Sequence, residues 1–518
     1  MDSPRNEAEI VEIELRKQVT FEDGSATPGS EYYTPLSQFL STSPPADDPY
    51  AGDVEAPTDG RISYSMYNGR WASGLWGVLE RTGLLGSSDS TFDAWLTATA
   101  AQVGLIVLSL PYTMSQMGMA WTVGCCVGFG LLGWWAVYLL SWMYFDLMSK
   151  LRRQDNPLPE GHVVQYHEVI GGMAGTLAGY VTFCFVIGGN ALAAVILVVS
   201  AASNLYYASD SLDKLHWTFV IGALSMISIF LPNFKHFRGI SVVGVLSSSI
   251  TALYLIFASQ THGQVVQENI KHSGPKHQVL FFTGMTNLIF SFGGQNITIE
   301  IMDAMKQPAK FKYVYMGVVG YTLALVIPSG FCVYWANGDI MFNRSNAFAV
   351  VPKSGWRKFS IALMVSHQVV IYIVVAVTVF IAFEKAAGVH TGRYILRIFA
   401  RIPIVLSIWF IALAIQFDGL INSLVGAFLV TAGGYVIPPI FFFIAYSTPA
   451  ARNSSVQQPP LLVGRSWVVL FIFNGLVVSF MLSVGMGWGG WASVSNVIQQ
   501  IDTLGLFDSC YQCSLEST

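Results

Sequence analysis

Amide and acidic side chains stand close together inside one of the most apolar stretches of the chain. They follow the pair Gly293-Gly294 and comprise Gln295, Asn296, Glu300 and Asp303. Side-chain amides can donate hydrogen bonds to a carboxylate, and a carboxyl group in apolar surroundings can take up and release a proton. The residue types therefore indicate ligand binding and proton transfer.

A second apolar stretch contains His367. The ordinary pKa of histidine, about 6.5, suits a proton carrier near neutral pH. Glu300, Asp303 and His367 are thus the candidates for proton coupling. Each also has a structural interpretation. Glu300 could be a fixed partner of a lysine or of backbone donors, and Asp303 an interfacial charge near Lys306. His367 could be a neutral histidine bonded to a backbone carbonyl.

Other chemistry finds little support in the sequence. No nucleophile–base pair, metal-ligand set or phosphate-binding loop stands out, so we expect no enzyme, no cofactor, no metal and no nucleic-acid partner. Cys510 and Cys513 form a C-x-x-C motif near the C-terminus. One such pair cannot supply the four ligands of a structural zinc site, and no βαβ pattern surrounds it. The motif is compatible with a local extracellular disulfide.

Length and composition place these residues in a membrane protein. Of the 518 residues, 53% are hydrophobic and 11% are charged, whereas soluble domains carry about 25% charged residues. Blocks of about 20 apolar residues cross a bilayer as helices, because lipid offers backbone groups no other partner. The sequence predicts an all-α polytopic membrane protein with eleven transmembrane helices, at residues 94–117, 120–148, 175–202, 216–232, 239–260, 279–303, 313–336, 359–383, 403–422, 424–446 and 466–489.

The loops set the expected orientation, because Lys and Arg favour the cytoplasmic side. With the N-terminus inside, fourteen Lys and Arg residues fall in cytoplasmic loops and seven in outside loops. Eleven helices then place the C-terminus outside. The sequon at Asn343 falls in an outside loop and is a candidate for glycosylation, whereas the sequon at Asn453 falls inside and should be unused.

Two of the predicted helices are interrupted. The first contains Gly104 and Leu110-Pro111, and the sixth contains Gly293-Gly294. Glycines for close helix packing would explain each interruption alone, but not the polar cluster beside the second. The five-span spacing suits a five-plus-five inverted repeat in which the first helix of each half is broken at the midplane. The positive end of a half-helix can hold a carboxylate there.

The N-terminal region differs from the rest of the chain. Its first ninety residues contain fifteen Asp and Glu against six Lys and Arg, and Ser, Pro, Gly and Asp crowd residues 24–60. Such a composition is typical of disorder. We expect a disordered acidic cytoplasmic tail over 1–90, a transmembrane transporter domain over 91–490 and an extracellular tail over 491–518.

Long stretches of the chain resemble one known family. They include LPYTMSQMGM at 110–119, SNAFAVVPKSGWR at 345–357, CYQC at 510–513 and all of 262–315. From about Thr91 to Cys513 the chain resembles the auxin influx carriers, the AUX/LAX branch of the amino acid/auxin permease superfamily. The resemblance implies a LeuT-type fold of eleven helices. It also implies proton-driven import of indole-3-acetic acid, or a related small organic acid, across the plasma membrane.

The chain departs from the family where the substrate is expected. Gln295 replaces a family histidine and Asp303 another, and Ala101, Leu105 and Leu197 replace amide residues. Gln102 is kept, and Asn296 replaces a small residue. The expected substrate-binding set is Ala101, Gln102, Gly104, Leu105, Leu197, Phe292, Gly293, Gly294, Gln295, Asn296 and His367.

The expected partners are a small auxin-like acid, protons and the surrounding lipid, with the protein acting as a monomer. Because the pocket residues differ from the family, a proton-coupled amino acid permease of the same superfamily is the alternative. A transporter-like receptor that signals through the acidic tail is the second alternative.

Overall fold

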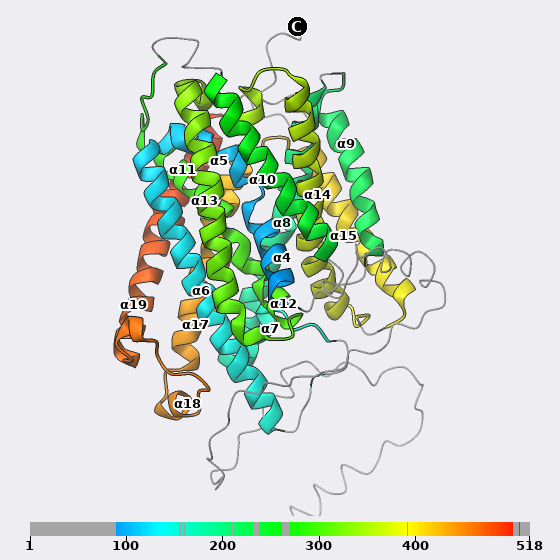
Figure 1. Cartoon of the computed structure of the whole chain (residues 1–518). Helices are drawn as coiled ribbons and strands as arrows, with labels where there is room; N and C mark the ends of the chain where they lie inside the picture. Colours follow the sequence, from blue (N-terminus) through cyan, green and yellow to red (C-terminus); the bar gives the residue numbers. More distant parts are fainter. Residues whose placement is uncertain are drawn as a thin grey trace, which may run out of the picture.

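The computed structural model describes residues 90–154, 158, 162–209, 211–231, 238–261, 270–390, 392–500 and 507. All regular structure in these residues is helical, and the helices pack into one bundle (Figure 1). The α-helices are α4 Thr91–Val103, α5 Ile106–Met117, α6 Met119–Arg153, α7 Tyr166–Ala174, α8 Thr176–Ala208, α9 Lys214–Ser225, α10 Arg238–Thr261, α11 Gln278–Ser291, α12 Thr298–Asp303, α13 Phe311–Asn337, α14 Gly355–Ala386, α15 Tyr394–Ala414, α16 Asp418–Val425, α17 Ile437–Ala445, α18 Pro449–Asn453, α19 Trp467–Phe480 and α20 Gly489–Gln499.

Short 3-10 and π-helical segments complete the structure. The 3-10 segments are η1 Met226–Phe230, η4 Gly293–Ile297, η5 Pro308–Lys310, η6 Gly338–Asn343, η7 Ala347–Ala349 and η9 Leu461–Val463. The π-helical segments are η8 Gly426–Val436 and η10 Met481–Trp488. Since π-helical turns lie in the last two predicted spans, those spans are continuous but unevenly wound.

The prediction of a polytopic all-helical membrane protein is confirmed, whereas the count of eleven spans is not. In the described residues, eight helices are long and apolar enough to cross a membrane, or nine if the bent pair α4–α5 counts as one. The predicted fourth span is a shorter apolar helix, Lys214–Phe230. The predicted sixth span is divided into α11, η4 and α12.

The predicted span at 403–422 is wrong in its bounds. Helix α15 already begins at Tyr394, and α16 starts at Asp418 after a non-helical connection. The sequence reading assigned Arg397 and Arg401 to a cytoplasmic loop because of their charge. They are instead buried inside the helix, since a carboxylate on α14 pairs with both. Near the C-terminus, α20 continues to Gln499, past residue 490, where the predicted transmembrane domain ends.

Both predicted interruptions are present. Helix α4 ends at Val103, α5 begins at Ile106, and the pair is bent by 41°. In the sixth helix, α11 ends at Ser291 and the 3-10 turn η4 separates it from α12. The first helix starts at a capping box: the Ser90 hydroxyl accepts from the Asp93 N–H at 3.1 Å, and the Asp93 carboxylate accepts from the Ser90 N–H at 3.3 Å.

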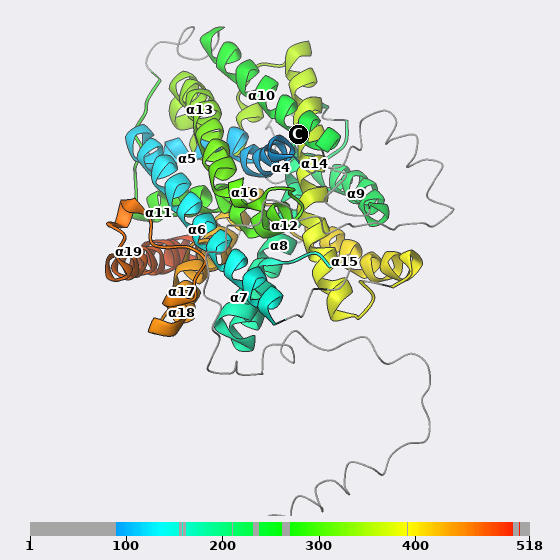
Figure 2. The same ribbon diagram turned by 60° about the horizontal axis from the view of Figure 1, so that its bottom comes forward.

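The two broken helices lie inside the bundle. Figures 1 and 2 show α19 at one side and α9 with α15 at the other, with α4, α5 and α8 between them. Helix α8 packs along α14, the most enclosed of the spans, with 78% of its most apolar stretch buried. In α15 and in Trp467–Gln499 the value is 28%, as expected for helices that face lipid on most sides.

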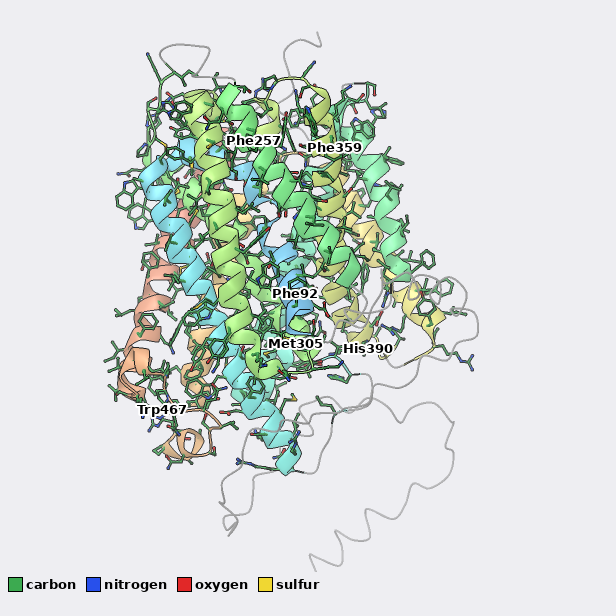
Figure 3. All side chains as sticks on the ribbon, in the orientation of Figure 1. Phe92, Phe257, Met305, Phe359, His390 and Trp467 are labelled. Atoms are coloured by element: carbon green, nitrogen blue, oxygen red, sulfur yellow. The ribbon has the colours of Figure 1, made fainter. Side chains whose placement is uncertain are left out.

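The two ends of the bundle can be followed in Figure 3. Met305 and His390 lie at one end, and Phe257 and Phe359 lie at the other. At the first end, the segment from His162 and helix α7 pack against α12 and α14. By the predicted orientation this end faces the cytoplasm.

A buried ion-pair cluster ties α14 to α15 at this end. The Glu384 carboxylate accepts from Arg397 Nε at 2.8 Å and from Arg401 Nε at 2.6 Å, and His390 Nδ1 lies 3.0 Å from it. Arg401 Nη1 also donates to the carbonyls of Ile229 and Leu231, at 2.9 and 2.6 Å. The cluster thus fixes the connection after η1 as well.

Replacing Glu384 by Gln should destabilise the protein by about 3–5 kcal/mol, because two buried guanidinium groups lose their carboxylate. A clear fall of the apparent melting temperature in detergent is the expected result. Lys358→Gln, on the exposed face of the same helix, is the matched control and should melt like the wild type. Equal melting of both variants would show that the cluster does not stabilise the fold.

Candidate functional site

A cavity of about 80 Å³ lies between the two breaks. It exceeds the about 10–15 Å³ that one water molecule needs. Its wall comes from both broken helices, from α8, α14 and η8, and is lined by Ala101, Gln102, Leu105, Gly189, Asn190, Ala193, Leu197, Phe290, Ser291, Gly293, Gly294, Asn296, Ile297, Ile371, Val375 and Val430. Seven residues of the expected substrate-binding set are among them.

The wall is apolar except for three amides and one hydroxyl. Gln102, Asn190 and Asn296 supply the amides, and Ser291 supplies the hydroxyl. No Asp, Glu, Lys, Arg or His belongs to the lining among the described residues. The cavity therefore suits a ligand with an apolar body and one polar end, whose charge is met by amides and by helix ends rather than by a counter-ion.

Four expected residues do not line the cavity: Gly104, Phe292, Gln295 and His367. The Gln295 side chain is fully buried and faces away, toward Gly434 and Gly133. A Cβ on Gly434 would come within 2.3 Å of Gln295 Nε2, so this glycine makes room for the amide. Position 295 directly follows the glycine pair, but the 3-10 turn rotates its side chain out of the cavity.

Gln102 joins the two breaks. Its Nε2 donates to the carbonyl of Ser291 at 3.0 Å, and its Oε1 accepts from the Tyr315 hydroxyl at 3.1 Å. The Ser291 carbonyl is left without a regular helical partner where α11 ends. Gly294 permits this contact, since a Cβ there would lie 2.3 Å from Gln102 Oε1. The retained family amide thus positions the site as well as lining it.

His367 lies behind the first break and is fully buried. Its Nδ1 is 2.7 Å from the carbonyl of Gly244, which can only accept, so Nδ1 carries a proton. Its Nε2 has no hydrogen-bond partner among the described residues and points toward Gly104. A Cβ on Gly104 would lie 3.2 Å from Nε2 and 2.3 Å from Ile371 Cδ1. This is the geometry of a neutral histidine, with one nitrogen left to accept a proton.

Glu300 is fully buried in α12, below the second break. Its Oε1 accepts from Gln165 Nε2 at 3.4 Å, and its Oε2 has no partner among the described residues. None of the ion pairs in that part of the chain includes it. The alternative of a carboxylate fixed by a lysine is therefore not what the structure shows, because Lys385 pairs with Glu168 at 2.8 Å.

Asp303 has a different environment. Its Oδ1 accepts from the Tyr144 hydroxyl at 2.8 Å, and its Oδ2 accepts from the Val164 N–H at 3.1 Å. Both carboxylate oxygens are thus engaged in joining α12 to α6 and to the segment before α7. No ion pair with Lys306 is among these contacts, and a role of Asp303 in proton coupling stays a prediction.

Sequence reasoning missed three polar residues near the cavity, namely Asn190, Thr378 and Gln165. Asn190 donates to the Thr378 hydroxyl at 3.1 Å, and Gln165 donates to the Thr378 carbonyl at 3.0 Å. Asn190 could have been found as the amide after Gly188-Gly189 in the apolar third span. Gln165 gives no such signal, because it stands in a polar connection.

Two peripheral predictions have different outcomes. Asn343 is exposed at the end of η6, and its glycosylation stays a prediction. Cys510 and Cys513 lie outside the described residues, as does the tail up to residue 89.

Two broken helices around an enclosed cavity define a membrane transporter of the LeuT type. The structure resembles the crystal structure of MhsT in complex with L-phenylalanine, with a TM-score of 0.54 and 13% sequence identity, over 77% of this chain and 100% of that one. At this identity the likeness shows the fold alone. It confirms the predicted LeuT-type architecture.

The chain belongs to the transmembrane amino acid transporter family, whose model matches residues 87–486, and within it to the AUX/LAX proteins. Auxin transporter-like protein 2 of Medicago truncatula is 42% identical over 82% of this chain and 87% of that protein. Auxin transporter protein 1 of Arabidopsis thaliana is 40% identical over 82% and 87%. Auxin transporter-like protein 2 of Oryza sativa subsp. japonica is 41% identical over 84% and 90%. Membership of a transporter family also confirms that the chain is not an enzyme.

Replacing Gly294 by Ala should lower the initial transport rate by at least about tenfold, because the new Cβ displaces Gln102 and the two breaks lose their register. The rate should be normalised to the protein at the cell surface. Gly475→Ala is the control, since a Cβ there would meet no atom within 4 Å. An unchanged rate in Gly294→Ala would show that the contact does not position the site.

Proposed function

We propose that this transporter imports indole-3-acetic acid, or a closely related aryl acid, together with protons. The carrying observation is the cavity at the two breaks of a chain that is 40–42% identical to proteins named auxin transporters. Leu105, Leu197 and Phe290 supply apolar wall for a ring. Amides and half-helix ends supply donors for a carboxyl group.

Proton coupling follows from energetics. An anion that enters against an inside-negative potential loses about 2.3 kcal/mol per charge per 100 mV. Entry with more than one proton reverses the sign, so a titratable group must respond to the site. Glu300 and His367 are the two titratable candidates that retain an open acceptor atom: Glu300 Oε2 and His367 Nε2 have no partner in the described structure.

The proposal includes a plasma-membrane location, with the N-terminus in the cytoplasm and the C-terminus outside. Without the buried Arg397 and Arg401, twelve Lys and Arg residues remain in the expected cytoplasmic loops against seven in the outside loops, which supports this orientation. Helix α7, Glu300 and the Glu384 cluster then lie on the inner side of the cavity. We further propose that the monomer is the working unit, because one chain contributes both breaks and the whole cavity wall.

A proton-coupled amino acid permease is the alternative function. The changes at Ala101, Leu105, Leu197 and Gln295 and the family's description favour it. The cavity wall opposes it, because an amino acid brings an ammonium group and no carboxylate lines the described cavity. Only backbone carbonyls, amide oxygens and the Ser291 hydroxyl could accept from such a group.

Uptake of radiolabelled indole-3-acetic acid into cells that express the full chain should be several-fold faster at about pH 5.5 than at about pH 7.5, since protons drive entry. A tenfold excess of unlabelled amino acids should leave it unchanged. Cells with an empty vector give the background, which matters because the protonated acid crosses lipid unaided. Competition by amino acids would favour the permease, and uptake equal to background would exclude import of this acid.

Replacing Glu300 by Gln should abolish the acid stimulation of uptake while exchange of bound substrate continues, because glutamine preserves the shape but cannot bind a proton. His367→Gln tests the second candidate in the same way. Lys358→Gln, an exposed change on α14, is the control and should keep the wild-type pH dependence. Wild-type pH dependence in both the Glu300 and the His367 variants would contradict these assignments.

A further inference from the structure

Gln165 connects groups that belong to different parts of the site. It lies between the end of α6 and the start of α7 and is fully buried. Its Nε2 donates to two acceptors, the Thr378 carbonyl at 3.0 Å and Glu300 Oε1 at 3.4 Å. Since an amide nitrogen has two N–H groups, both are engaged.

Thr378, whose carbonyl is the first of these acceptors, also contacts residues of the substrate cavity through its hydroxyl. The Thr378 hydroxyl donates to the Val375 carbonyl at 2.6 Å and accepts from Asn190 Nδ2 at 3.1 Å. Asn190 and Val375 line the cavity. A chain of contacts thus runs from the cavity wall to the Glu300 carboxyl: the Thr378 hydroxyl bonds Asn190, the Thr378 carbonyl bonds Gln165, and Gln165 bonds Glu300.

The backbone N–H of Gln165 bonds a cluster of charged groups at the expected cytoplasmic end of the bundle. Its N–H donates to Glu168 Oε2 at 2.9 Å, and the same oxygen accepts from Lys385 Nζ at 2.8 Å and lies 3.1 Å from His162 Nε2. Lys385 also donates to the Val163 carbonyl at 2.6 Å. These charged groups are partly exposed, whereas Gln165 and Glu300 are not.

The other titratable groups around Glu300 have partners of their own. Burial raises the pKa of the Glu168 carboxyl, but the Lys385 ammonium and the His162 ring outweigh it and hold that pKa well below its usual range. On α6 and α12, Tyr144 and Asp303 bond each other. The Tyr166 hydroxyl donates to the Gly433 carbonyl at 2.7 Å. On α4, Asp93 caps its own helix.

Of Glu168, Glu300 and Asp303, Glu300 is the carboxyl with neither a cation nor a donor to each oxygen among the described residues, and burying such a carboxylate is costly. Two acceptor atoms here have no partner among the described residues, Glu300 Oε2 and Gln165 Oε1. A proton on Glu300 removes the unpaired charge and gives the carboxyl an O–H donor. The position of Gln165 decides how well that carboxyl is held.

We propose that Gln165 is a positioning residue that holds the Glu300 carboxyl in the chain of contacts to the cavity and so sets the pH dependence of transport. The role rests on the proposed proton-coupled import. Glutamine does not carry the proton itself. One proton binds at Glu300 and is later given up to water, and no other bond changes.

The test compares variants of the full-length protein in proteoliposomes, by uptake of indole-3-acetic acid at several pH values and by exchange at equal pH. In Gln165→Leu, uptake at about pH 5.5 should be at most about twice the uptake at about pH 7.5. Exchange should stay above about half of the wild-type rate. Gln368→Leu is the matched control. That glutamine lies on α14 ten residues before Thr378, is equally buried and bonds Asn204 and Ser200 of α8, so its variant should keep the wild-type ratio.

Gln165→Glu gives a second readout that a purely structural role would not move. Two carboxyl groups in one site cannot easily both ionise, so the midpoint of the acid stimulation should shift to higher pH by about one unit. This variant has nearly the shape of glutamine and keeps the experiment decisive if Gln165→Leu does not fold.

The outcomes separate this role from the proposed function. Acid-stimulated uptake in the wild type with an unchanged ratio in Gln165→Leu, or an unshifted midpoint in Gln165→Glu, would overturn the positioning role alone. The same loss of ratio in Gln368→Leu would also overturn it. A wild type that takes up the acid without any pH dependence would instead refute proton coupling, and this role with it.

Discussion

The hydrogen bond from Gln102 to the carbonyl of Ser291 connects the two places where transmembrane helices stop being helical. Within a bilayer every backbone polar group needs a partner inside the protein, so an interrupted helix is tolerated only where other groups meet its open ends. Gln102 meets one such end, and the Tyr315 hydroxyl holds Gln102 in turn. The cavity exists because these bonds stabilise both interruptions side by side.

The cavity wall carries amides but no charged side chain among the described residues, so a bound acid meets no counter-ion there. An acid bound there meets donors and the positive ends of half-helices, while the titratable groups stand one layer behind it. His367 borders the first break, and Glu300 lies below the second. For the proposed proton coupling, this separation means that the substrate and the proton-binding group form no fixed ion pair that would hold the substrate.

The inner end of the bundle is fastened by short polar contacts to the connection before α7. Val163, Val164 and Gln165 each contact α12 or α14, through Lys385, Asp303 and Thr378 respectively. These bonds hold the connection against α12 and α14, and α14 contributes Ile371 and Val375 to the cavity wall. The Glu384 cluster lies between α14 and α15.

The sequence by itself determined the membrane class, both helix interruptions and the family, because apolar length, glycine pairs and long matching stretches are local features. It misjudged α15, because Arg397 and Arg401 read as loop charges until Glu384 is seen beside them. Only the tertiary structure decided which way the side chains of the second break point: Asn296 enters the cavity, and Gln295 turns toward Gly434. It also brought Gln165 to Glu300 across 135 residues of sequence. Contacts of that kind depend on how helices pack, and no local pattern encodes them.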